Sequence, residues 1–271
     1  MLKLAKFLKP FLVILLITVL LLFGQAMCDL NLPNFMSDIV NIGIQQSGIE
    51  HAAPEVISQK GYQFMNAFMD KAQKQIVEEN YELLDKTEEN IKKYPLLEME
   101  EIYILKSVNK ESYEVLDPIF SEAAYTFMNV IKDMSAMAAG NEMKDQQTET
   151  VEEETDWTLG LVLKDVIERN TQKNVTSQDL RELNLEELYK IIPFITNMPE
   201  ENLESARTFA KETPEQMQKQ VGITLTKAFY IETGLDIGKI QSQYILKIGG
   251  FMILIALAGR NCNYFGRIFL S

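Results

Sequence analysis

A hydrophobic segment near the C-terminus stops about halfway through the thickness of a membrane. Residues 248–259 read IGGFMILIALAG, and the polar and basic tail begins directly afterwards with Arg260. These 12 residues span roughly 18 Å as a helix, whereas the hydrocarbon core of a bilayer is about 30 Å thick. Apolar side chains cover every side of a helix projection, so a water-exposed helix is excluded. The segment therefore predicts the start of a membrane helix whose continuation is missing.

The genetic code gives the tail a second interpretation. Read one base later, ordinary codons for RNCNYFGRIFL encode the almost wholly apolar string ATAIISVAFFL. For example, Asn followed by Tyr or Cys forces Ile or Thr. Joined to residues 248–259, the shifted string restores an uncharged run of about 23 residues, the length of a spanning helix. We therefore hypothesise a one-base frameshift after Gly259, which makes residues 260–271 an aberrant tail.

The first hydrophobic segment is long enough to cross by itself. Residues 11–28 are 18 consecutive uncharged residues, and three lysines precede them. This pattern predicts an interfacial elbow helix over 1–10, then the first transmembrane helix and its outer extension over 11–44. The lysines place the N-terminus in the cytoplasm, so the chain after this span lies outside the membrane. A signal peptide cleaved after Ala26 is the rival, but the apolar pattern is long and continues past Asp29.

Negative charge is concentrated between the two hydrophobic segments. The chain has a net charge of −13, and residues 45–244 alone hold 20 basic and 37 acidic residues, a net charge of −17. Such a region repels nucleic acid and anionic lipid surfaces, so we expect no nucleic-acid partner. Cationic partners remain compatible with this charge.

The sequence offers no catalytic, cofactor or metal residues that we would name. Cys28 and Cys262 are the only cysteines and His51 is the only histidine. They support neither a disulfide framework nor zinc or Ser-His-Asp chemistry. We expect Cys28 to be a buried inert thiol, Cys262 to be a product of the shifted frame, and His51 to be a solvated residue beside a helix start.

Two stretches resemble one transporter family. LKLAKFLKPFLVILLITVLLLFGQAMCDLNLPNFMSDIVNIGI is similar to the opening of type I ABC exporters, in particular bacterial multidrug half-transporters, where a basic elbow helix enters the first transmembrane helix. YILKIGGFMILIALAG resembles the start of their second transmembrane helix, and the shifted frame continues it with similar small and β-branched residues. Together the two stretches cover about 60 of the 271 residues.

The resemblance implies ATP-driven export of amphipathic or drug-like substrates by the intact protein, in the cell membrane. Its partners would be membrane lipid and a second half-transporter, and ATP and Mg²⁺ would bind only in a nucleotide-binding domain. This chain has no GxxxxGK[ST] motif and no LSGGQ-type signature. Gly238 and Lys239 form a Gly-Lys pair, but the next residue is Ile240, which lacks the hydroxyl that would bind Mg²⁺ in that motif. We therefore expect this chain to have no cofactor, no enzymatic activity and no transport competence of its own.

The insert over 45–244 reads as an acidic helical extracytoplasmic domain where ordinary exporters have a short loop. Helical spacing predicts a segment from Pro54 to about Tyr94, broken or bent around Gly61. Asp117 and Pro118 read as a cap and a first-turn proline that open a helix to about Ala139. Residues 140–156 lack aromatic residues and apolar periodicity, which predicts a mobile acidic loop rather than a calcium site.

Further helices are expected over 157–170, 185–192, 199–211 and from Pro214 onward. Residues 171–183 have the cap pattern of a helix-turn-helix, but their acidity and outer location argue against DNA binding. Four methionines could bind soft metals, yet adaptable core packing is the usual explanation for Met128, Met134, Met137 and Met143.

The sequence thus predicts an all-α fold for a membrane protein fragment. It has one full transmembrane helix, an extracytoplasmic helical domain and a partial second transmembrane helix over 245–259. The alternative is a membrane-anchored extracytoplasmic binding or sensing domain, which needs no frameshift. A secreted enzyme ranks third because no clustered catalytic constellation is visible.

Overall fold

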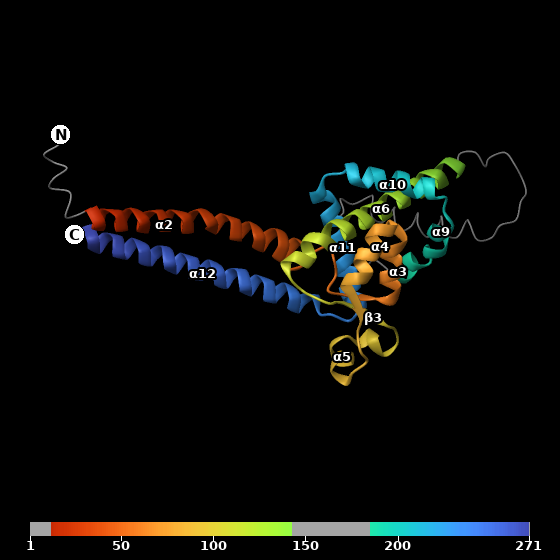
Figure 1. Cartoon of the computed structure of the whole chain (residues 1–271), viewed down its shortest axis with the longest axis horizontal. Coiled ribbons are helices and arrows are strands. Elements are labelled where there is room, and N and C mark those ends of the chain that lie inside the picture. Colours follow the sequence, from red (N-terminus) through yellow and green to blue (C-terminus); the bar gives the residue numbers. More distant parts are fainter. Residues whose placement is uncertain (1–11, 143–184, 271) are drawn as a thin grey trace, which may run out of the picture. The chain divides into compact units, whose positions relative to one another are not determined.

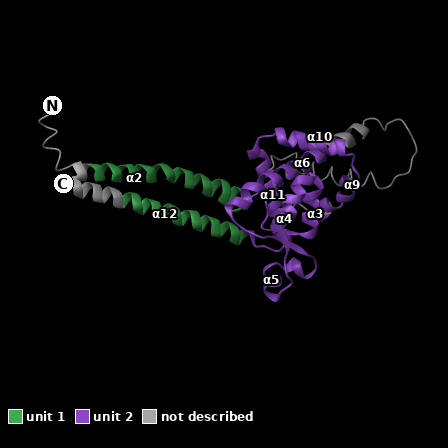
Figure 2. Ribbon diagram, viewed as in Figure 1, with its two compact units in different colours: residues 1–49, 238–271 green, residues 50–237 purple. Residues whose placement is uncertain are grey.

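The chain divides into two compact units. The computed structural model describes residues 12–142 and 185–270 (Figure 1). Unit 1 combines residues 1–49 with residues 238–271, and unit 2 comprises residues 50–237 (Figure 2). One continuous domain is therefore inserted, in sequence, between the two halves of a helical unit.

Unit 1 is built from two long helices. The first is α2, Leu12–Asp38, which continues as a π-helical stretch, η2, Ile39–Gln45. The second is α12, Ile237–Leu270. Within them, residues 16–45 and 237–260 are long and apolar enough to cross a membrane. Only 6% and 17% of their most apolar windows are buried, whereas a core helix of a water-soluble protein would be mostly buried.

The two helices run antiparallel and approach each other at small residues. A side chain added at Gly43 would lie 3.0 Å from Ile245, and one added at Gly259 would lie 3.4 Å from the Cβ of Cys28. Near the first contact, the Gln241 side chain donates a hydrogen bond of 2.9 Å to the Gly43 carbonyl oxygen. Close approach at small residues is how helices associate where lipid removes the hydrophobic driving force.

Unit 2 has a helical centre. Its long helix α6, Lys110–Glu142, packs against α10, Glu200–Glu212, and α11, Glu215–Glu232. The helices α10 and α11 each begin directly after a proline, with an acidic residue in the first turn that favours the helix N-terminus. Among the described side chains of this unit, five phenylalanines are buried, each of which stabilises the fold by about 1.5–3 kcal/mol: Phe64, Phe68, Phe120, Phe127 and Phe229.

A small antiparallel sheet lies in the same unit. Its strands are β1, Val56–Ser58, β2, Tyr81–Leu83, and β3, Ile102–Leu105, in the order β1-β3-β2. Val56 pairs with Ile104, and Tyr81 pairs with Leu105. The described chain is therefore mostly helical, as expected, with a sheet that the sequence pattern did not predict.

Short helices complete unit 2. The elements around the sheet are α3, Gln59–Phe68, α4, Lys71–Asn80, α5, Glu88–Lys93, and the 3-10 turn η3, Pro95–Glu98. Two more follow the undescribed stretch: α8, Leu185–Tyr189, and α9, Ile192–Asn197. The expected helices near 185–192, 199–211 and after Pro214 are thus confirmed within a few residues.

The predicted helical segment from Pro54 to about Tyr94 is wrong as one bent element. The chain forms β1, α3, α4, β2 and α5 in that interval, and Gly61 lies inside α3 rather than at a break. A new helix begins at Lys71 because Asp70 forms a capping box with Gln73. Tyr81 then leaves the helix, and its hydroxyl donates a hydrogen bond of 2.6 Å to the Pro54 carbonyl.

The predicted helix start at Asp117 and Pro118 is also wrong. Helix α6 begins about two turns earlier, at Lys110, and contains Pro118. Its proline removes a backbone hydrogen bond to the carbonyl of Glu114, an exposed residue, so water can solvate that oxygen. The Asp117 side chain instead binds backbone N–H groups of a distant segment.

The predicted stop of the second membrane helix at Gly259 is not seen. Helix α12 begins at Ile237, before the expected 245, and continues through Arg260 to Leu270. The sequence-based expectation that this helix is too short to cross a membrane is therefore wrong, because residues 237–260 are long and apolar enough to cross one. The elbow helix over 1–10, the rest of the acidic loop beyond Glu142, and the elements expected over 157–170 and 171–183 lie outside the described residues.

Candidate functional site

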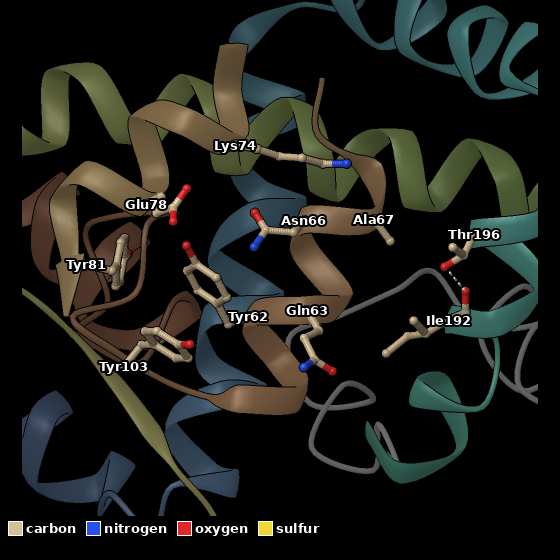
Figure 3. A pocket seen from close by; sticks show the side chains of 10 residues that line it. All are labelled: Tyr62, Gln63, Asn66, Ala67, Lys74, Glu78, Tyr81, Tyr103, Ile192 and Thr196. Carbon is tan, nitrogen blue, oxygen red and sulfur yellow. Dashed lines mark hydrogen bonds between the residues drawn. The ribbon is translucent and has the colours of Figure 1, made fainter. Parts of the chain in front are cut away.

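Unit 2 contains a groove of about 650 Å³ beside the sheet, which we call the tyrosine groove (Figure 3). Helices α3 and α4 form one side, strands β2 and β3 another, and α9 the rim. The residues on which its chemistry depends are Tyr62, Asn66, Lys74, Glu78, Tyr81 and Tyr103. Gln63, Ala67, Ile192 and Thr196 complete the lining.

Three tyrosines form the aromatic wall of the groove. The Tyr62 and Tyr103 rings stack with their centroids 4.3 Å apart and their planes 14° from parallel. The Tyr81 and Tyr62 rings make a T-shaped contact, with their centroids 6.1 Å apart. Tyr81 is held in place by its bond to the Pro54 carbonyl, and it is almost fully buried. The wall is therefore a fixed surface made by one helix and two strands that are far apart in sequence.

The phenol groups of Tyr62 and Tyr81 stay neutral at physiological pH. Burial raises the pKa of Tyr62, although a hydrogen bond from the Asn66 side chain acts in the opposite direction. Burial also raises the pKa of Tyr81 well above its ordinary value. The rings consequently offer polarisable faces and hydroxyl groups rather than phenolate charges.

The polar groups of the groove come from consecutive turns of two helices. Asn66 lies one turn after Tyr62 on α3, and its Oδ1 is buried with no hydrogen-bond partner. Lys74 and Glu78 lie one turn apart on α4, and both are exposed. Figure 3 shows the Glu78 carboxylate near the Tyr62 hydroxyl, while the Lys74 side chain extends away from Glu78. The groove therefore has an acceptor-rich end and a separate cationic end.

His51 does not have the solvated role that its sequence suggested. Its Nδ1 lies 2.9 Å from Asp117 Oδ2, and its ring stacks on Tyr113 at 3.5 Å. Asp117 Oδ1 also accepts hydrogen bonds from the backbone N–H groups of Ala52 and Ala53, at 2.9 and 3.1 Å. The geometry fastens the segment before β1 to helix α6, which is a structural role.

A second polar junction surrounds Glu232 at the end of α11. Its Oε2 accepts hydrogen bonds of 2.8 Å from both Ser58 Oγ and the Tyr189 hydroxyl. Burial raises the pKa of Glu232, whereas those two hydrogen bonds lower it. The residues connect β1, α8 and α11, and the Ser58 hydroxyl also caps α3. We assign this junction to the fold because each group already has a partner.

The residues singled out by the sequence do not meet at one site. Cys28 is half-buried in α2, and Met128 is half-buried in α6, while the side chains of Met134, Met137 and Cys262 and all of Met143 are outside the description. Within the described residues, no group of three or more His, Cys, Asp or Glu is arranged to hold a metal ion. Sequence reasoning missed the tyrosine groove; its only local signals were the one-turn spacings of Tyr62 with Asn66 and of Lys74 with Glu78.

Fold and site together describe a mostly helical protein with two helices long and apolar enough to cross a membrane and a separate acidic domain. No family model matches the chain, and comparisons with the curated proteins and with the solved structures find no similar protein.

Proposed function

We propose that the chain is the N-terminal part of the transmembrane domain of a type I ABC exporter, a half-transporter with a large extracytoplasmic insert. In this proposal α2 with η2 is the first transmembrane helix, α12 is the second, and unit 2 is the insert. The intact protein exports amphipathic or drug-like substrates and pairs with a second half-transporter. ATP and Mg²⁺ bind in a nucleotide-binding domain that these residues do not include.

The observation that carries the proposal is the antiparallel helix pair with unit 2 inserted between its members. Both helices leave large apolar side chains exposed, including Phe23, Leu30 and Leu254 at 60%, 70% and 63%. Exposed apolar area of this extent requires a membrane or a partner. The order of first helix, outer domain and returning helix is the order that the sequence resemblance implies.

The proposal places unit 2 on the outer side of the membrane. Its acidic charge is tolerated there, and the three lysines before residue 11 favour the cytoplasm for the N-terminus. In this proposal the remaining helices and the ATPase motor belong to the intact protein and not to these residues.

DNA sequencing tests the proposal directly. We would sequence the genomic DNA across the codons of Ile255 to Ser271 and the DNA that follows. An additional base after Gly259, followed in the restored frame by further hydrophobic spans and a GxxxxGK[ST] motif, is the expected result. An intact frame that ends at Ser271, with no open frame downstream, would overturn the exporter assignment.

One observation favours a second candidate, a membrane-anchored extracytoplasmic binding domain. Helix α12 continues without a break through Arg260 to Leu270, so no frameshift is required for a second long helix. Arg260 is exposed and lies at the end of the 237–260 span, where snorkelling lowers the cost of about 2.5–3.5 kcal/mol that an arginine has at the centre of a membrane helix. This candidate predicts that the 271-residue chain accumulates stably in membranes; rapid degradation in a pulse-chase experiment would exclude it.

A further inference from the structure

The tyrosine groove contains a polar group that lacks a partner. Asn66 lines the groove from α3, and its Oδ1 is buried without a hydrogen bond. Buried polar groups are nearly always paired, so an unpaired acceptor beside a hollow indicates a missing donor. Because Oδ1 itself is buried, a ligand N–H group would supply that donor once the Asn66 amide turns its oxygen toward the groove.

The surroundings of Asn66 favour a positively charged donor. The Glu78 carboxylate and the Tyr62 hydroxyl lie at the same end of the groove (Figure 3). Stacking on Tyr103 covers one face of the Tyr62 ring, Tyr81 makes a T-shaped contact with the same ring, and Tyr62 lines the groove. Aromatic faces attract ammonium and guanidinium groups, and a carboxylate pairs with them. The negative charge of residues 45–244 also draws cations to this unit.

The rest of the groove is suited to a peptide rather than to a compact amine. Its volume of about 650 Å³ exceeds what one side chain fills, and the groove is open along the surface. Beyond the acceptor-rich end it offers the Gln63 amide, the apolar side chains of Ala67 and Ile192, and the Lys74 ammonium. These groups complement the alternating N–H, carbonyl and apolar groups of a peptide. A carbonyl oxygen of the peptide would accept a hydrogen bond from the Lys74 ammonium.

We propose that the tyrosine groove binds a short cationic peptide segment. An arginine or lysine side chain of the peptide enters between Tyr62, Asn66 and Glu78, and the following residues lie along Ala67 and Ile192 toward Lys74. This inference goes beyond the exporter proposal and does not depend on it, because binding is measurable in the chain whether or not transport occurs.

The test uses the full chain in neutral detergent micelles at low ionic strength. Isothermal titration calorimetry measures binding of the peptide acetyl-Gly-Arg-Phe-Gly-amide, with empty micelles as the blank. The matched peptide has citrulline in place of arginine, which keeps the shape and removes the charge. We expect the arginine peptide to bind about fivefold more tightly, since a cation over an aromatic face and beside a carboxylate has that magnitude of effect.

Paired variants separate the groove from the general acidity of unit 2. Glu78→Gln should weaken binding of the arginine peptide about threefold, whereas Glu79→Gln, the same charge change on a neighbouring exposed residue outside the lining, should leave it unchanged. Lys74→Gln should not weaken the contribution of the arginine side chain to binding. The affinity for the arginine peptide relative to the citrulline peptide, which we call the arginine-to-citrulline ratio, should therefore stay the same or rise. Both glutamates are exposed, so neither substitution threatens folding.

Four results would overturn the proposal. They are the absence of saturable binding, equal affinity for the arginine and citrulline peptides, equal effects of Glu78→Gln and Glu79→Gln, and a fall in the arginine-to-citrulline ratio in Lys74→Gln. Phenylethylammonium serves as the small-amine probe. If it binds as tightly as the peptide, the groove recognises a compact amine and the peptide assignment is wrong.

Discussion

The Asp117 carboxylate fastens the segment before β1 to helix α6, and its removal should loosen unit 2. It accepts bonds from His51 and from two backbone N–H groups, and Lys219 Nζ lies 3.3 Å from its Oδ2. Asp117→Asn should lower the free energy of unfolding by about 2 kcal/mol at pH 7, because hydrogen bonds to a charged group contribute roughly this much. Urea unfolding followed by circular dichroism measures the change, with exposed Asp85→Asn as the control.

The same carboxylate predicts a pH dependence with a defined sign. Burial raises the pKa of Asp117, but the bonds from His51 and Ala53 and the charge of Lys219 outweigh it and lower the pKa below its ordinary value of 3.8. The stabilisation is therefore present above pH 3.8 and is lost as the pH falls through the folded-state pKa. The stability gap between wild type and Asp117→Asn should shrink over that range. A gap that widens as the pH falls would contradict this account.

Arg207 holds the end of α3 through a buried guanidinium. It donates to the carbonyl oxygens of Phe68 and Met69 at 3.0 and 2.9 Å, and it pairs with Glu200 and Glu204. Arg207→Leu leaves two carbonyls without a donor, so we expect a loss of about 3 kcal/mol in unfolding free energy. Arg207→Lys should recover only part of the lost unfolding free energy, because an ammonium cannot bridge both carbonyl oxygens as the planar guanidinium does.

Lys211→Leu on the same helix is the comparison for Arg207. Lys211 is half-exposed, and its pairing distance to Glu122 is 3.7 Å, so the expected loss is below about 1 kcal/mol. Equal losses for Arg207→Leu and Lys211→Leu, measured by urea unfolding, would show that the Phe68 and Met69 carbonyls do not depend on the guanidinium.

At the scale of elements, the contact between α2 and α12 is open to a covalent test. The Cβ of a residue placed at Gly259 lies 3.4 Å from the Cβ of Cys28, close to the 3.5–4.5 Å that disulfides need. Gly259→Cys in a Cys262→Ser background should therefore crosslink to Cys28 on mild oxidation. After proteolysis within unit 2, the two helix fragments should stay together on a non-reducing gel and separate on a reducing one.

Gly250→Cys is the matched control, because nothing lies within 4 Å of a side chain added at Gly250. It should not crosslink in the same background. Efficient crosslinking at Gly250 and none at Gly259 would mean that α12 presents a different face to α2.

Long elements were predictable from sequence and short ones were not. The run over residues 11–28 and the proline-led starts at Glu200 and Glu215 are local signals, and the structure has helices there. Strands β1 and β2 have three residues each, too few for alternation to be recognised. The tyrosine groove was invisible for a related reason, since Tyr62, Tyr81 and Tyr103 meet only after β2 pairs with β3. Tertiary contacts likewise overrode the cap signal at Asp117.

At the scale of the whole molecule, the account is that two membrane helices hold an acidic domain outside the cytoplasm. Residues 16–45 and 237–260 are suited by length and composition to cross a membrane, and the lysines before them favour the orientation that we propose. The exporter proposal and the anchored-domain alternative share this topology. A topology measurement therefore tests what both depend on.

The decisive measurement is cysteine labelling with a membrane-impermeant maleimide in spheroplasts that express the full chain. In a Cys28→Ser, Cys262→Ser background, Thr208→Cys reports on unit 2, where Thr208 is exposed, and Lys6→Cys reports on the N-terminus. The account predicts that Thr208→Cys is labelled in intact spheroplasts and that Lys6→Cys is labelled only after permeabilisation. Protection of Thr208→Cys until the membrane is opened would place unit 2 in the cytoplasm and contradict the central claim.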